Sequence, residues 1–260
     1  MKTEQFKKRF GTAKTNKQKN WESLYRETME LFCPNRENFY TSNPGQKKGR
    51  DVYTASPYIA MDKAANNIHS SLTPHMKRWV NLKPGRLVPE EQQKDAAENL
   101  ATIKDTLFDH LFSSNFDLAI SAFYRDLMIG TAAIMVSGTA KEPLMFHSVP
   151  LDQLYISTGA SGVVETVFRR YEIKAGAIAD TWDDAKIPDD VKEIAKENPE
   201  KKLWAIEGTS PQKITKFDME TEKDIKVDGY GYFVLLETFM ANFLVEREMQ
   251  VSPWIVARWS

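Results

Sequence analysis

The sequence predicts an α+β fold, with a helix-rich N-terminal half followed by short antiparallel strands. Up to about residue 130, apolar residues recur at three- and four-residue steps, which is the period of amphipathic helices. After Gly130, short runs of β-branched and aromatic residues alternate with turns rich in Gly, Pro and Ser, a pattern typical of strands. Hydrophobic residues make up 42% of the chain and charged residues 27%, as in ordinary folded domains. A chain in which a run of helices is followed by a run of strands is typical of the α+β class.

A basic segment opens the chain. Glu4 is its single acid, against seven basic residues that are separated by polar ones: Lys2, Lys7, Lys8, Arg9, Lys14, Lys17 and Lys19. This pattern predicts a solvated, flexible arm over residues 1–19. Lys7, Lys8 and Arg9 are candidates for contact with DNA phosphates or with an acidic partner. The alternative is a mobile terminus with no dedicated role.

Residues 20–130 are predicted to hold four helices, each from its apolar spacing and its end signals. The third is the most regular, and Leu100, Ile103, Leu107 and Leu111 lie along one face of it. Gly130 is well placed as the C-terminal cap of the fourth. The predicted helices run from Trp21 to before Pro34, from Ser56 to before Pro74, from Pro89 to about Phe112, and from about Phe116 to Ile129.

A polar loop is predicted between the first two of these helices. Residues 35–50 are rich in Asn, Gly and Lys, a composition that favours flexibility. Lys47, Lys48 and Arg50 are further candidates for contact with DNA or a partner. The glycines do not form a nucleotide-binding loop, because the spacing Gly-x-x-x-x-Gly-Lys-Ser/Thr is missing.

Residues 131–260 are predicted to be rich in strands, with one or two surface helices at about 174–200. The last two strands are a candidate hairpin. The chain closes on Trp254 and Trp259 in a core-like segment, which predicts a truncation at Ser260 because natural termini tend to be polar. The predicted strands cover residues 132–137, 144–149, 154–157, 163–173, 203–206, 214–217, 230–239 and 242–248.

Bulk properties narrow the classes of function. The formal charge is −1, from 35 basic and 36 acidic residues, so any contact with nucleic acid has to be local. Cys33 is the only cysteine, which excludes an intrachain disulfide and a thiolate zinc site and fits assembly in a reducing compartment such as the cytoplasm. No apolar run approaches the roughly 18 residues that a membrane-spanning helix needs. We expect no cofactor, no metal and no membrane anchor.

Two patterns have a chemical interpretation beside a plainer one. Asp218 with Asp224 and Lys226 fits a metal-dependent nuclease of two acids and a lysine, or an exposed hairpin with alternating charge. The segment Phe168-Arg169-Arg170-Tyr171 is a weak candidate for stacking on single-stranded nucleic acid. The plainer interpretation is favoured for both, and we assign no catalytic residue.

Eight segments of the chain form a set whose order and spacing are informative. They are Trp21-Glu22-Ser23-Leu24-Tyr25-Arg26-Glu27, Pro34-Asn35-Arg36, Ser70-Ser71-Leu72-Thr73-Pro74, Trp79, Ser114-Asn115-Phe116, Asp126-Leu127-Met128-Ile129-Gly130-Thr131-Ala132, Pro150-Leu151, and Pro253-Trp254-Ile255-Val256-Ala257-Arg258-Trp259. In their order and spacing these segments resemble the head-to-tail connecting (portal) family of podovirus-like phages, and the resemblance runs through essentially the whole chain. One departure is the turn from Tyr53 to Pro57, where relatives usually carry an acid and hydroxyls.

The resemblance implies a non-catalytic subunit of a ring of about twelve copies at one capsid vertex, through which double-stranded DNA is packaged and ejected. It implies that this chain is the N-terminal portion, a wing-type domain without most of the stem and clip. It also implies partners: the terminase, the major capsid and scaffolding proteins, and tail adaptor proteins. The expected location is the virion, after assembly in the host cytoplasm.

Three hypotheses therefore stand at the level of sequence. The first is the structural ring protein. The second is a metal-dependent nucleic-acid-processing enzyme that uses Asp224 and Lys226. The third is a monomeric adaptor that binds DNA through residues 1–19.

Overall fold

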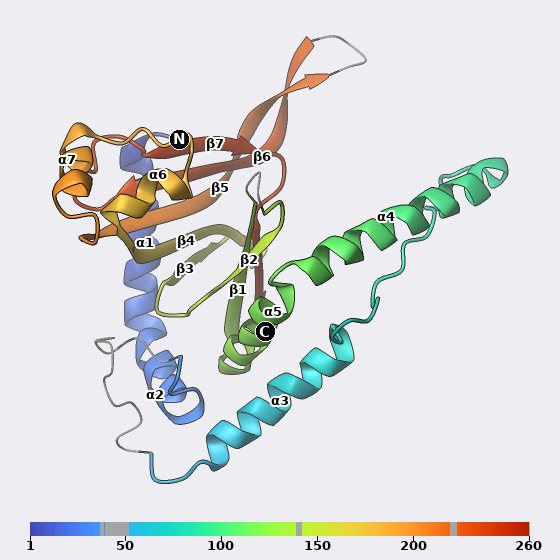
Figure 1. Ribbon diagram of the computed structural model, residues 1–260, viewed down its shortest axis with the longest axis horizontal. Coiled ribbons are helices and arrows are strands. Elements are labelled where there is room, and N and C mark those ends of the chain that lie inside the picture. Colours follow the sequence, from blue (N-terminus) through green and yellow to red (C-terminus); the bar gives the residue numbers. More distant parts are fainter. Residues whose placement is uncertain (37–38, 40–51, 139–141, 219–222, 260) are drawn as a thin grey trace. The chain divides into compact units, whose positions relative to one another are not determined.

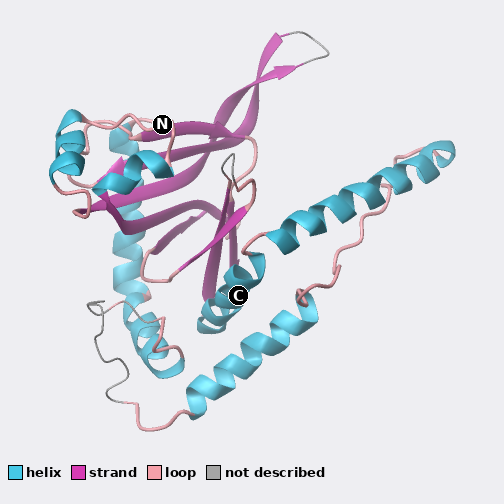
Figure 2. Cartoon of the chain, viewed as in Figure 1, coloured by secondary structure: helices cyan, strands magenta, loops and turns pink. Residues whose placement is uncertain are grey.

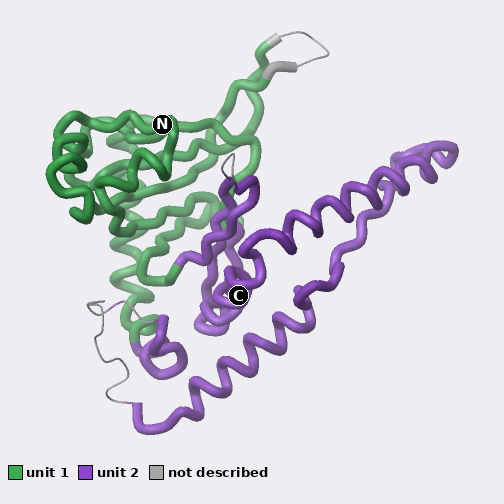
Figure 3. Tube along the Cα trace, viewed as in Figure 1, with its two compact units in different colours: residues 1–26, 150–254 green, residues 27–149, 255–260 purple. Residues whose placement is uncertain are grey.

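The computed structural model describes residues 1–36, 39, 52–138, 142–218 and 223–259 (Figure 1). It confirms the predicted α+β class, with seven α-helices and two β-sheets among these residues. The chain divides into two compact units (Figure 3). Unit 1 contains residues 1–26 and 150–254, and unit 2 contains residues 27–149 and 255–260.

Unit 1 is built on a five-stranded antiparallel sheet in the order β3-β4-β5-β6-β7. The predicted hairpin near its end is confirmed, because β6 pairs with β7 in antiparallel register. The strands are β3 (Leu154–Thr158), β4 (Val164–Lys174), β5 (Lys202–Asp218), β6 (Lys223–Leu236) and β7 (Val245–Met249).

Helix α1 (Thr3–Asn20) packs on one face of this sheet. Phe6, Phe10 and Ala13 are buried, and together with Phe168 and Phe233 they belong to one apolar core. The glycine at position 208 is needed there, because a Cβ would lie 2.4 Å from the Phe168 ring and 2.9 Å from the Phe6 ring. The chain opens with a helix tied to the core of unit 1.

The expectation of a flexible arm over residues 1–19 is therefore wrong. The basic residues of this segment suggested solvent on every side, but Phe6, Phe10, Ala13 and Lys17 recur at the spacing of one helical face. That face is buried against strands whose residues lie far along the chain, so the helix owes its stability to tertiary packing.

The other face of the sheet carries the short helices of residues 175–197: η2 (Ala175–Ala177), α6 (Ile178–Thr181) and α7 (Asp189–Glu197). Just after α6, Trp182 is buried and its Nε1 donates to the Tyr232 hydroxyl at 3.4 Å. Trp254 donates in the same way to Thr209 at 2.9 Å. The sheet is thus covered on both faces.

Strand β5 is one continuous strand where the sequence predicted two, residues 203–206 and 214–217. Gly208 and Pro211 gave the intervening residues the composition of a turn. Proline is tolerated at position 211 because β4 pairs with β5 only as far as Thr209, so one side of Pro211 has no neighbouring strand. From there β5 and β6 continue together as a two-stranded hairpin that projects beyond the sheet (Figure 2).

Unit 2 holds most of the predicted helices. Its core joins Ala65, Ile120, Phe123 and Tyr124 to Ile134 of the three-stranded sheet β2-β1-β8. Gly130 caps α5 as predicted, with a φ of 137°. The elements are α2 (Glu22–Phe32, which begins in unit 1), α3 (Ser56–Leu72), η1 (Glu90–Gln92), α4 (Gln93–Ser113), α5 (Phe116–Ile129), β1 (Thr131–Ser137), β2 (Met145–Val149) and β8 (Trp254–Arg258).

Candidate nucleic-acid and assembly surfaces

The candidate basic residues near the N-terminus lie on a fixed helix. Lys8 and Arg9 are exposed on α1, away from its buried face. Lys7 is half-buried, and its Nζ lies 2.9 Å from a carboxylate oxygen of Glu4. Two of the three predicted contacts are therefore presented to solvent. The other candidates, Lys47, Lys48 and Arg50, lie outside the described residues.

Lys17 has a structural role that the sequence did not reveal. Its side chain is buried, and Nζ donates to the backbone carbonyl oxygens of Leu151, Asp152 and Leu154, the last two at 2.9 Å. Desolvation lowers the pKa of this ammonium to about 8, against a smaller opposing effect of Asp152 and Glu22. Lys17 therefore ties α1 to the segment that enters β3 and is unavailable to phosphates.

Replacing Lys17 with methionine is expected to remove a pH dependence of unit 1. The unfolded chain binds a proton at this side chain up to a pKa of 10.5 and the folded chain only up to about 8. In the unmodified chain, the free energy of unfolding should therefore rise by up to about 3 kcal/mol as the pH increases from about 8 to 10.5. The same contribution is lost when the pH is lowered through 8, and it should be missing from Lys17→Met. Urea denaturation at several pH values in this window measures the rise.

The control is Lys8→Met, which keeps Lys17 and should keep the rise. The same rise in Lys17→Met would show that other groups cause it.

A buried polar network lies on the face of the sheet opposite α1. A carboxylate oxygen of Glu207 accepts from the Tyr232 hydroxyl at 2.9 Å, and the other lies 3.4 Å from the Arg169 guanidinium. Arg169 also donates to Gln153 at 3.0 Å and covers the Tyr171 ring, with 4.0 Å between the guanidinium carbon and the ring centroid. Desolvation raises the pKa of Glu207, and the nearby Arg169 opposes that effect. Among the described residues, none of these side chains has a buried polar atom without a hydrogen-bond partner, as expected of a structural feature.

Arg170, the neighbouring arginine, is also held by an ion pair and by a contact with an aromatic ring. Arg170 forms a bidentate ion pair with Glu237 at 2.7 and 3.2 Å, and its guanidinium carbon lies 3.7 Å from the centroid of the Trp204 ring. Both arginines of the segment Phe168-Arg169-Arg170-Tyr171 are therefore ion-paired and stacked inside the chain. The structure gives no support to their use as a platform for nucleic acid.

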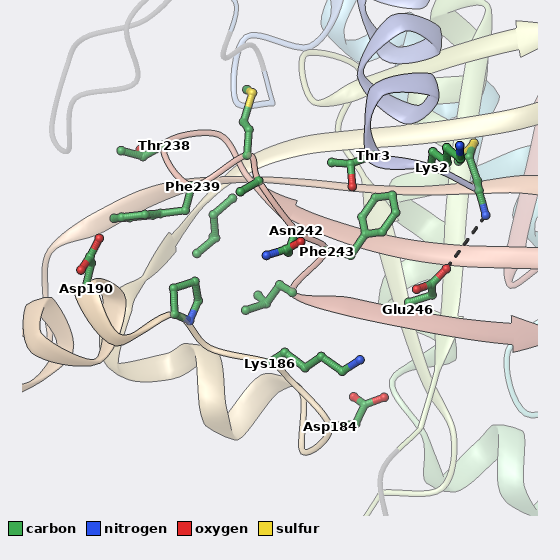
Figure 4. A pocket seen from close by; sticks show the side chains of 16 residues that line it. Lys2, Thr3, Asp184, Lys186, Asp190, Thr238, Phe239, Asn242, Phe243 and Glu246 are labelled. Atoms are coloured by element: carbon green, nitrogen blue, oxygen red, sulfur yellow. Dashed lines mark ion pairs between the residues drawn. The ribbon is translucent and has the colours of Figure 1, made fainter.

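A cavity of about 1090 Å³ lies in unit 1 beside the N-terminus (Figure 4). Phe239 and Phe243 line it together with charges of both signs. The amino group of Met1 lies 4.0 Å from a carboxylate oxygen of Glu246. Asp184 accepts from Nε of Arg247 at 2.8 Å, and this hydrogen bond lowers the pKa of Asp184. The mixed charges do not form a site of one sign for phosphate or for a cation.

The nuclease pattern falls on the projecting hairpin of β5 and β6. The register pairs Asp218 with Lys223 and Phe217 with Asp224, so the two acids occupy neighbouring positions of the ladder on opposite strands. Asp224 and Lys226 are exposed, and Lys213 forms an ion pair of 2.7 Å with Asp228. Among the residues that the structure describes, no group of three His, Cys, Asp or Glu side chains could hold a metal ion.

Three of the segments that carry the sequence resemblance meet inside unit 2. Arg36 Nε donates to the buried carboxylate of Asp126 at 2.9 Å, which joins the second of these segments to the sixth. The Trp259 indole donates to the carbonyl of Leu127 at 2.6 Å, and its backbone N–H donates to Gly130 at 3.0 Å. These contacts place Arg36, Asp126 and Trp259 in the packing of unit 2.

A family model of bacteriophage head to tail connecting proteins matches residues 3–260. The chain belongs to this family. The predicted family is thus confirmed, and it assigns the connector a structural role at the junction between phage head and tail, in the virion. Such a role is not enzymatic, and the family does not favour the nuclease interpretation. No curated protein matches the sequence.

In the part of the connector that the structure describes, no helix is both long enough and apolar enough to cross a bilayer.

Apolar side chains are exposed along the α3–α4 arm of the connector, defined as residues 56–113. The predicted stripe of α4 is not buried as a whole, because Ile103 is 55% exposed and Leu107 is 42% exposed. Leu72 and Leu87 are exposed as well. Trp79 holds the base of the arm, stacking on Phe116 with 6.1 Å between ring centroids. Helical spacing revealed the stripe but not that the chain leaves it uncovered.

Proposed function

We propose that the connector is a subunit of a portal ring of about twelve copies at one vertex of a podovirus-like capsid. In this proposal double-stranded DNA passes through the ring during packaging and ejection. The family match over residues 3–260 is the observation that carries the proposal. The α+β chain would supply the wing and outer body of each subunit.

The distribution of charge supports a ring that lets DNA move. The formal charge is only −1, and the charged groups of Lys17, Arg169 and Arg170 bind to groups within the chain. Each fixed phosphate contact adds salt-dependent affinity, so a chain with a net charge near zero is expected to hold a duplex more weakly than a strongly basic one. Lys8 and Arg9, with Lys7, Lys47, Lys48 and Arg50, remain the residues that we propose for DNA or partner contact.

The exposed apolar side chains of the α3–α4 arm, among them Ile103 and Leu107, support assembly. Soluble monomers rarely leave large contiguous apolar patches in water, and interfaces between like subunits are the more apolar class. In the proposed life cycle the ring assembles in the host cytoplasm with the major capsid and scaffolding proteins, a terminase docks on it during packaging, and tail adaptor proteins follow. The connector itself catalyses no step.

Negative-stain electron microscopy of the purified connector tests this function. We expect end-on views of a closed ring with a central hole wide enough for a DNA duplex. Particles of monomer size in every buffer and at every concentration would contradict the proposal.

A further inference from the structure

The exposed side of α1 has a fixed orientation in unit 1. Phe6 and Phe10 are buried against the sheet, and Nζ of Lys17 donates to backbone carbonyl groups of the segment that enters β3. Both ends of the helix are therefore held by the core of unit 1. Lys8 and Lys19 lie on the exposed side, about three turns and about 16 Å apart along the helix axis.

Four cations of α1 can bind a partner from outside the chain. Glu4 is the only acid of this helix, and its carboxylate binds Lys7. Among the residues that the structure describes, the four that form no ion pair are Lys8, Arg9, Lys14 and Lys19. Lys14 is half-buried, and the other three are exposed. We call these four residues the α1 cations.

The rest of unit 1 has the opposite balance of charge. Residues 150–254 contain more acids than bases. Helix α7, which covers the other face of the sheet, also carries an excess of acids: Asp189, Asp190, Glu193 and Glu197 against Lys192 and Lys196. An acidic surface repels a polyanion, whereas a local group of cations attracts it. We therefore expect a polyanion to meet unit 1 on the side of α1.

The uncharged side chains on the exposed side of α1 are polar. Gln5, Thr15 and Gln18 are exposed, whereas Phe6 and Phe10, the large apolar side chains of this helix, are buried. A stable protein interface has an apolar core, which this side of α1 does not supply. The oxygens of nucleic-acid phosphates accept hydrogen bonds from Lys, Arg, Thr and Gln side chains. The composition of the surface therefore favours a nucleic-acid backbone over an acidic protein.

We propose that the exposed side of α1 binds the phosphates of double-stranded DNA through the α1 cations. The proposal rests on the portal function proposed above, in which a duplex passes through the ring, and it names a surface that meets the duplex. DNA carries on the order of one charge per 1.7 Å of its axis, so cations spread over about 16 Å can contact several phosphates at once. Phosphate contacts carry no sequence information, so the binding is independent of base sequence.

The salt dependence of DNA binding tests the contact. A short labelled duplex is titrated with the full chain at several salt concentrations, and its fluorescence anisotropy is measured. Lys8→Gln with Lys19→Gln removes two α1 cations. The slope of log K against log salt should become shallower by about 2, equally for duplexes of unrelated sequence. Because both side chains are exposed, the fold should be kept.

The matched control is Lys192→Gln with Lys196→Gln on α7. This double variant changes the net charge by the same amount on the other face of the sheet, and it should leave the slope unchanged. Equal effects of the two double variants would show that binding follows net charge, which would overturn the assignment to α1. A lack of binding by the unmodified chain at low salt would overturn it as well.

Polyglutamate is the probe for an acidic protein. We expect it to bind the unmodified chain more weakly than the duplex does at the same salt concentration. If polyglutamate binds as tightly as DNA and loses affinity in Lys8→Gln with Lys19→Gln, the surface serves an acidic protein and the proposal is wrong.

Sedimentation velocity of the same samples separates this inference from the proposed function. A ring whose duplex binding does not depend on Lys8 and Lys19 would overturn the phosphate contact and leave the ring standing. A chain that stays monomeric would contradict the ring, and a slope lowered only in the α1 variant would still support the contact.

Discussion

Replacing Phe6 with alanine is expected to lower the free energy of unfolding of unit 1 by about 3–5 kcal/mol. The Phe6 side chain is 1% exposed, and its ring meets three others edge-on: Phe168 at 5.2 Å, Phe243 at 5.4 Å and Phe233 at 6.0 Å between centroids. Its loss leaves a cavity between α1 and the sheet that β4, β5 and β6 cannot close, because their register is fixed by pairing. Urea denaturation followed by circular dichroism measures the effect.

The matched control is Lys8→Ala, on the exposed side of the same helix. It should change the free energy of unfolding by less than about 0.5 kcal/mol. If Phe6→Ala were equally neutral, residues 3–20 would behave as a free arm, and their packing against the sheet would be wrong. The same packing predicts that deletion of residues 1–19 destabilises unit 1.

Replacing Arg169 with alanine is expected to cost about 3–5 kcal/mol at neutral pH, because it leaves the buried Glu207 carboxylate without its cation. The pKa of Glu207 is already raised by desolvation, and removal of Arg169 raises it further. A carboxyl group with a raised pKa in the folded state stabilises the fold fully below its unfolded pKa near 4.5 and loses that contribution as the pH rises through its folded pKa. The variant should therefore recover stability between neutral pH and about pH 5.

Arg170→Ala is the control within the same strand. Its partner Glu237 keeps 26% of its side-chain surface in water, against 3% for Glu207. Solvent can replace the lost cation there, so we expect a cost of about 1 kcal/mol and little recovery in acid. Equal losses in the two variants would show that burial of Glu207 is not what makes Arg169 necessary.

Much of the fold could be predicted because its signals are local. The spacing of Phe116, Ile120 and Phe123 with a glycine at position 130 predicts α5, and the structure places that helix at Phe116–Ile129. The period-two runs after Gly130 similarly predicted β1 to β4 to within a residue or two. The ends of such elements can be predicted because capping residues and turn residues mark them in the sequence.

What could not be predicted depends on distant residues. Helix α1 looks like a basic tail until its partners Phe168 and Phe233 are known, and these lie more than 150 positions away. Strand β5 contains Gly208 and Pro211, whose composition favours a turn and whose place in the ladder is set by neighbouring strands. In each case local composition was overridden by tertiary packing.

For the candidate surfaces too, the sequence predicted what depends on local composition and missed what depends on distant residues. Charge counts identified Lys8 and Arg9 as exposed cations, but not that Lys17, further along the same helix, is buried. Its spacing from Phe10 and Ala13 was the available signal. Helical spacing likewise found the apolar side of α4, whereas only the fold shows that Ile103 and Leu107 are exposed. An apolar stripe in a sequence does not say whether its partner is in the same chain.

The central claim is that this connector acts as one of many identical subunits. Native mass spectrometry tests it most directly, because each copy adds 29.8 kDa. We expect a dominant species of about twelve copies at low micromolar concentration. A single species of 29.8 kDa across all concentrations and salts would contradict the account.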